Sequence, residues 1–114
     1  MALNYNLAKV YAISEDDDNF ALQIVSLFIT EVPAEIVNIK EGVEEKDYKK
    51  TYAAAHKIKP TLDLLGMTNG FEEILVIMDW TKREGKRKEI KDTVKSVDSR
   101  VEKAVKEIKK DFNL

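Results

Sequence analysis

The chemistry that this sequence offers centres on a single histidine. His56 is the only histidine in the 114 residues, and the chain contains no cysteine. Because histidine ordinarily changes charge between about pH 5 and 8, His56 is the natural candidate for nucleophilic or proton-transfer chemistry near neutral pH. Such a role requires the imidazole to lie where a reaction partner can reach it.

The helical period predicts that His56 lies at the edge of an amphipathic helix. With the core direction set through Ala55, His56 falls about 100° round from it, at the boundary between core and solvent. Tyr52 and Lys59 flank the histidine at i−4 and i+3. The surrounding surface is completed by Lys49, Ala53, Pro60 and Asp63. A boundary position suits a nucleophile, and the alternative is a half-buried structural histidine held by a neighbour.

Other chemistry finds little support in the residue types. One histidine and no cysteine leave only carboxylates for a metal site, and no carboxylate pair stands at ligand spacing beside His56, so we expect no metal. The sequence has neither a nucleophile elbow nor a glycine-rich phosphate loop. The acidic run of residues 15–18 lacks the glycine and the last glutamate of a calcium loop, and we interpret it as a helix cap.

The stretch from Ala55 to Gly66 resembles the signature of histidine-containing phosphotransfer domains. That signature reads Ala-His-x-Leu-Lys-Gly-Ser, followed by small residues and a glycine ten positions after the histidine. The matching residues are Ala55, His56, Lys59 and Gly66, with Ile58 and Thr61 as conservative replacements. Upstream, Leu27-Phe28-x4-Pro33 and Asp47-Tyr48 resemble the family's long helix and the start of its histidine helix. The resemblance covers residues 6–112.

Three positions depart from the family pattern. Pro60 stands where the family has a glycine, and Leu62 and Asp63 occupy positions that are usually small. A proline four residues after His56 cannot donate the amide that would bond the His56 carbonyl, so we expect the helix to bend just past the histidine. The other two departures alter the surface that a partner would meet.

The resemblance implies a phosphorelay intermediate of two-component signalling. His56 would accept a phosphoryl group from a receiver-domain phosphoaspartate and pass it to another receiver, with Lys59 facing the transferred group. The docking surface would include Tyr52, Ala53, Pro60 and Asp63, and the structural motif Ala55, Thr61 and Gly66. The implied partners are response-regulator receivers and a hybrid histidine kinase, with magnesium on the receiver only and no cofactor on this chain. The family's free-standing members are neither turnover enzymes nor autokinases.

Two rival functions remain open. In the first, the chain is a non-catalytic helical interaction module and His56 is structural. In the second, residues 82–110, with twelve Lys and Arg against six Asp and Glu, bind nucleic acid. That segment lacks the aromatic interleaving of single-strand binders and a helix-turn-helix companion, so we expect a solvated helix face and no nucleic-acid partner.

The elements that must hold His56 are all predicted to be helices. The dominant hydrophobic period is 3.6, and only four glycines and two prolines interrupt it. We predict an all-α antiparallel four-helix bundle with a short N-terminal capping helix, in one domain over residues 1–114. The capping helix is expected over about residues 6–12. The long second helix has a predicted kink at Pro33 and the core positions Phe20, Ile24, Leu27, Phe28, Val32, Ile36, Ile39 and Val43.

The third helix is predicted to begin at an Asp47 cap and to end at Gly66. Its expected core face is Tyr48, Thr51, Tyr52, Ala55, Ile58, Leu62 and Leu65. A capping box at Asn69-x-x-Glu72 should open a fourth helix from Phe71 to about Glu84, ended by Gly85. Its run of residues 74–78 is apolar on nearly all sides, which predicts a place between neighbours. Trp80 lies off the main stripe and could either pack against the last helix or remain partly exposed as a contact; we favour packing.

The last helix is predicted over Arg87 to Phe112, with a narrow apolar seam. The seam consists of Ile90, Val94, Val97, Val101, Ala104 and Ile108. It could serve either an antiparallel hairpin with the fourth helix or a dimer. The short preceding loop favours the hairpin, and we expect a monomer.

The sequence also bears on location. The first six residues lack the basic and apolar regions of a signal peptide, and no unbroken apolar run approaches the roughly 18 residues of a membrane span. The absence of cysteine fits a reducing compartment. We therefore expect a cytoplasmic protein with no membrane partner.

Overall fold

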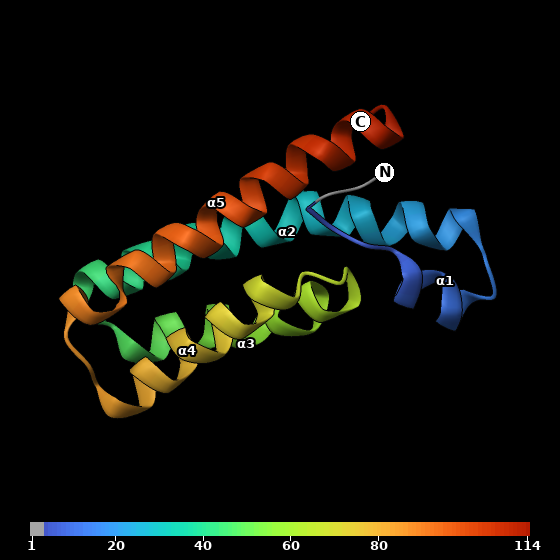
Figure 1. The fold of residues 1–114 in the computed structure, drawn as a ribbon. Helices are drawn as coiled ribbons and strands as arrows, with labels where there is room; N and C mark the ends of the chain where they lie inside the picture. Colours follow the sequence, from blue (N-terminus) through green and yellow to red (C-terminus); the bar gives the residue numbers. More distant parts are fainter. Residues whose placement is uncertain (1–3) are drawn as a thin grey trace.

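The computed structural model describes residues 4–114, and within them the protein is helical, with no strand. The helices are α1 (Ala8–Ser14), α2 (Asp18–Glu45), α3 (Tyr48–Leu64), α4 (Thr68–Arg83) and α5 (Arg87–Phe112). From α2 to α5 each helix packs against the next, and α5 returns to α2 (Figure 1). The all-helical prediction is therefore confirmed.

The first part of the chain connects several helices. Figure 1 shows α1 beside the first half of α2, beyond the ends of α3 and α4. It begins two residues later than predicted and ends two residues later. Just before it, the Asn6 N–H donates to the Leu65 carbonyl at 2.7 Å, and the Tyr5 hydroxyl donates to Asp111 Oδ2 at 2.7 Å. These bonds join the end of α3 to the last turns of α5.

The acidic cap predicted for α2 is confirmed. Asp17 is the N-cap, and its Oδ1 accepts from the Asn19 and Phe20 amides. α2 continues as one helix through Pro33, and the kink expected there stays a prediction. Leu27 was wrongly placed in the core, because it is 46% exposed. Adjacent residues lie about 100° apart, and the buried stripe runs instead through Ala21, Val25, Phe28, Val32, Ile36, Ile39 and Val43.

α2 bears on the expected cellular location without deciding it. It is long and apolar enough to cross a membrane by length and composition, with an 18-residue window of mean hydropathy 1.6. An unbroken apolar run is a stricter criterion than a window average, because the average tolerates isolated charged residues. α2 meets only the second criterion. A core helix of a soluble protein passes the same criterion, so the finding alone decides nothing about location.

The junction between α3 and α4 is tighter than predicted. Gly66 adopts a left-handed φ of 65°, and the Gly66 and Met67 amides bond the Asp63 and Leu62 carbonyls at 3.0 Å each. This is a Schellman ending, which confirms Gly66 as the stop of α3. The predicted capping box at Asn69 is wrong, because α4 starts at Thr68 directly after this turn and Asn69 lies inside the helix.

The far end of α4 is organised by a buried tryptophan. The Trp80 side chain is fully buried, lies 5.0 Å from the Tyr48 ring of α3, and donates from Nε1 to the Lys86 carbonyl at 2.8 Å. Burial of Trp80 was predicted, but its ring partner is on α3 rather than on the last helix. The left-handed residue that ends α4 is Glu84 rather than Gly85.

The burial patterns of the last two helices differ. All six predicted seam residues of α5 are buried, and α5 packs against both α4 and α2. The seam is therefore filled within the chain. In contrast, the apolar run of α4 is not covered on all sides, since Leu75 and Val76 are exposed. α4 buries Ile74, Ile77 and Met78, and the two residues between Ile74 and Ile77 turn outward.

Candidate functional site

The helix that carries His56 is fixed at its start. Asp47 caps α3 by accepting from the Lys50 amide at 3.0 Å, and Thr51 Oγ1 donates to the Asp47 carbonyl at 2.9 Å. α2 approaches closely here, because a Cβ added at Gly42 would lie 2.2 Å from Thr51 Oγ1. α3 is thus held against α2 one turn before the histidine.

His56 lies further out than the sequence predicted. Its side chain is exposed rather than at the boundary between core and solvent. The expected core direction through Ala55 was inaccurate, because Ala54, Ala55 and Ile58 are all buried. The centre of the buried face therefore falls between Ala54 and Ala55, which places His56 about 150° away from it. The imidazole is accessible to a partner.

An aromatic stack holds the histidine ring. The Tyr52 and His56 rings lie with centroids 5.8 Å apart and an interplanar angle of 22°. On α4, the Lys82 ammonium lies 5.7 Å from the centroid of the Tyr52 ring, within the range of a cation–π contact. The site thus includes Lys82, which sequence reasoning missed. The short connection between α3 and α4 could have indicated this contact, because it makes the two helices antiparallel neighbours.

The second cation near His56 is the predicted one. Lys59 lies one turn along α3, is half-buried, and makes no ion pair within residues 4–114. Lys57, directly after the histidine, is instead bound to Glu35 of α2 at 3.0 Å. The Asn38 amide and then the Lys57 ammonium lower the pKa of Glu35. Lys59 is therefore a lysine close to His56 in the helix that no carboxylate neutralises, and Lys82 adds a positive charge against the Tyr52 ring.

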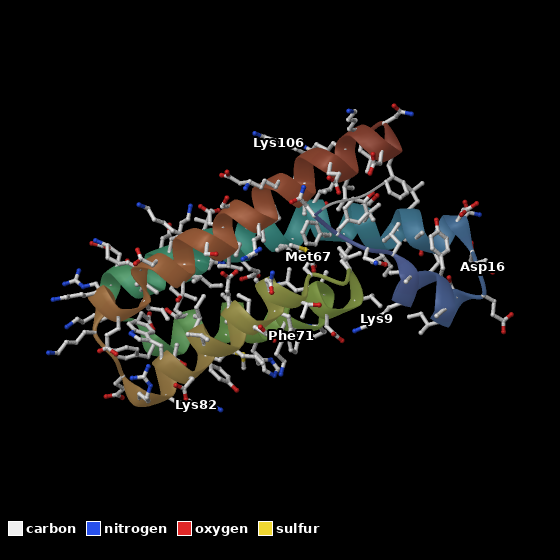
Figure 2. The ribbon with its side chains drawn as sticks, in the orientation of Figure 1. Lys9, Asp16, Met67, Phe71, Lys82 and Lys106 are labelled. Atoms are coloured by element: carbon white, nitrogen blue, oxygen red, sulfur yellow. The ribbon has the colours of Figure 1, made fainter. Side chains whose placement is uncertain are left out.

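The remaining predicted residues are those of the expected docking surface and those of the expected structural motif. Ala53 and Pro60 are exposed beside His56, at i−3 and i+4. Asp63 is also exposed, but it binds Lys9 of α1 at 2.8 Å, which was not foreseen (Figure 2 labels Lys9). Lys49 is exposed at i−7, about two turns away. The predicted structural residues Ala55, Thr61 and Gly66 are respectively buried, half-buried and at the end of the helix.

Pro60 does not end α3, which continues to Leu64. The bend predicted just past the histidine stays a prediction. Ala53 and Pro60 have short side chains, a methyl group and a pyrrolidine ring. At these two positions beside His56, therefore, no long side chain projects from the helix. A flat protein surface can therefore approach the imidazole.

The other chemical features of the described residues lie elsewhere. Within residues 4–114 no group of three or more His, Cys, Asp or Glu side chains could hold a metal ion. A polar cavity of about 310 Å³ opens where the N-terminal segment crosses the α3–α4 turn. Of the predicted site residues only Gly66 lines it, so this cavity is separate from the histidine surface.

Comparison of the chain with protein-family models, with curated proteins and with solved structures gives no match. A functional assignment therefore rests on the motif around His56 and on the geometry of its surface.

Proposed function

We propose that this protein is a phosphorelay intermediate in which His56 carries the phosphoryl group. The observation that carries the proposal is the exposed imidazole, stacked on Tyr52 and followed one turn later by the unpaired Lys59. The helices α2 to α5 would form the antiparallel four-helix bundle that presents such a histidine on a helix side. The motif from Ala55 to Gly66 supports the same assignment.

The transfer reaction balances with His56 alone as the acceptor on this chain. A ring nitrogen lone pair attacks the phosphorus of a receiver's phosphoaspartate, forming a P–N bond as the acyl P–O bond breaks. The aspartate carboxylate leaves on the receiver. The reverse step, with a second receiver, returns the group to an aspartate. Magnesium belongs to the receiver in this scheme.

Charge and shape around His56 support the proposal. The Lys59 ammonium is a compact point charge that suits the oxygens of a phosphoryl group. Ala53 and Pro60 keep the surface low, so a receiver can bring its aspartate to the ring. Because in-line transfer depends on close positioning, this access matters as much as the charge. We further propose a hybrid histidine kinase upstream and a cytoplasmic location.

The rival interaction module predicts binding without transfer. The test is incubation of the chain with a panel of receivers, each phosphorylated on its aspartate with a small-molecule phosphodonor. A relay gains an acid-labile phosphate from at least one receiver and returns it to another. A chain that binds receivers but gains no phosphate would be an interaction module.

A further inference from the structure

The most apolar stretch of the chain lies in α2 and is largely uncovered. Only 28% of the 18-residue apolar window within α2 is buried. Leu22, Leu27 and Val37 are 40%, 46% and 51% exposed. The exposed positions of α2 thus include large apolar side chains where a solvated helix face would be polar.

Part of this surface forms a continuous stripe without charge. It consists of Leu22, Ser26, Ile29, Pro33 and Val37, at spacings of three and four. These side chains lie within about 80° of one another around the helix and extend over about 22 Å. Its two ends are exposed and its middle is half-buried. An ordinary solvated helix face would carry charges within this length.

The stripe borders α5 and is remote from the histidine surface. Pro33 and Val37 line a groove together with Val101 and Val105 of α5. Glu35, which binds α3 through an ion pair, projects about 160° away from the stripe. An occupant of the groove would therefore leave the surface around His56 uncovered.

α5 gives this groove a basic rim. Lys106 and Lys109 line the groove itself, and Lys91 and Lys95 line an adjoining pocket that shares Lys40 and Asp98 with it. None of these four lysines makes an ion pair within the described chain, and Figure 2 shows Lys106 projecting outward from α5. The groove and the adjoining pocket also hold four carboxylates. Glu44 and Asp98 are already paired with Arg87 and Lys40, and the other two are Asp92 and Glu102. A fitting occupant is an apolar helix flanked by carboxylates.

The first half of α2 has this composition itself. It exposes Leu22 at one end of the stripe and begins within the acidic run of residues 15–18. We propose that two copies of the chain associate through α2, with the first half of each α2 lying in the α2–α5 groove of the other. The helices are antiparallel about a twofold axis near Ile29, which makes the contact self-complementary.

Both apolar and charged contacts follow from this register. Leu22 meets the partner's Val37, and Ser26 meets the partner's Pro33. The acidic run of residues 15–18 faces the partner's Lys91 and Lys95. This proposal departs from the monomer expected from sequence. The apolar seam of α5, which raised the question of a dimer there, is filled within the chain, and the stripe of α2 lies outside it.

Sedimentation equilibrium of the full chain from micromolar to millimolar concentration tests the proposal. We expect a reversible dimer that weakens as salt rises, because the flanking contacts are exposed ion pairs. Leu22→Glu and Val37→Glu should each weaken association about tenfold or more. The matched control is Leu75→Glu on α4, where the leucine is 41% exposed against 40% for Leu22, and it should leave the dimer intact.

Because the chain has no cysteine, cross-linking can test the register directly. Under oxidation, a mixture of the Leu22→Cys and Val37→Cys variants should form a disulfide-linked dimer, and neither variant alone should do so to the same extent. A chain that stays monomeric at every concentration would overturn the proposal. So would a dimer that survives both glutamate variants, equal cross-linking of either cysteine variant alone, or vesicle binding by a chain that is monomeric in solution.

Discussion

α3 exposes the imidazole of His56 to solvent, and the residues around it explain why. The exposed position of His56 follows from two buried alanines before it, Ala54 and Ala55, which turn the next residue away from the core. Tyr52 supports the ring from the preceding turn by stacking. Lys57 forms an ion pair with Glu35 of α2, whereas Lys59 forms none within the described residues. The two lysines therefore lie in different electrostatic environments.

The pair of lysines gives a matched prediction. Lys59→Ala should slow phosphoryl transfer or shorten the life of the phosphohistidine by roughly 10- to 100-fold, because it removes a charge worth about 1–3 kcal/mol beside the phosphoryl group. Lys57→Ala removes an equal charge that is held by Glu35, and its transfer rate should stay close to that of the wild type. Rapid-quench measurement with a phosphorylated receiver gives both rates. Unchanged rates in the Lys59 variant, in both directions, would make Lys59 a solvated surface charge.

At the scale of elements, Pro60 is the feature of α3 that the motif does not explain. An interior proline removes a helix hydrogen bond and typically costs about 3 kcal/mol or more. Pro60→Ala should therefore raise the thermal midpoint and alter the transfer kinetics. Pro60→Lys should block docking, because a long charged side chain would stand beside His56 on a low surface. Wild-type exchange by the lysine variant would mean that receivers bind elsewhere.

The loop between α4 and α5 gives a second test at this scale. A Cβ added at Gly85 would lie 2.5 Å from Trp80 Cδ1, and the indole is held by Tyr48 and the Lys86 carbonyl. Gly85→Ala should therefore destabilise the fold by about 1–3 kcal/mol in chemical denaturation. The control is Gly70→Ala in α4, where the nearest atom would be 3.8 Å away. Equal midpoints for the two variants would contradict close packing at Gly85.

The helices and most of their buried faces could be predicted from sequence, because periodicity records which side of a helix is apolar. The seam of α5, from Ile90 to Ile108, is the clearest case. Periodicity cannot fix the phase closely where two faces are apolar, and Leu27 was misplaced for that reason. The capping box predicted at Asn69 was wrong because the Schellman turn at Gly66 ends α3 and lets α4 begin at Thr68, one residue before Asn69.

At the scale of the whole molecule, the site could be predicted only within one helix. His56, Tyr52 and Lys59 share a face of α3, and helical spacing was sufficient to group them. Contacts between helices were invisible to that method. Lys82 comes from α4, and Lys9 reaches Asp63 from α1. Such contacts depend on how the helices align after folding, which a spacing rule does not encode.

The attachment of the N-terminal segment should make stability depend on alkaline pH. Burial, followed by the hydrogen bond to Asp111, raises the pKa of Tyr5 above its ordinary value of 10.0. A raised folded pKa gives stability that is complete below about pH 10 and is lost as the pH rises further. Tyr5→Phe should lower stability at neutral pH by about 1.5–3 kcal/mol, the contribution of a hydrogen bond to a charged group.

The same variant should flatten the loss of stability above pH 10. A smaller slope should remain from Tyr11, whose pKa is raised by burial and by the neighbouring Asp18 carboxylate. Denaturation curves from neutral to alkaline pH measure both effects. An alkaline slope as steep in Tyr5→Phe as in the wild type would place the titrating group elsewhere.

The location of the transferred phosphate decides whether His56 is the acceptor. The wild-type chain and His56→Gln are incubated with a phosphorylated receiver, and the phosphate is located by mass spectrometry under conditions that preserve phosphohistidine. Because His56 is exposed, the glutamine variant should keep its helical signal and thermal midpoint. We predict an acid-labile phosphate on His56 in the wild type and none in the variant. Labelling of His56→Gln at the wild-type level would contradict the account.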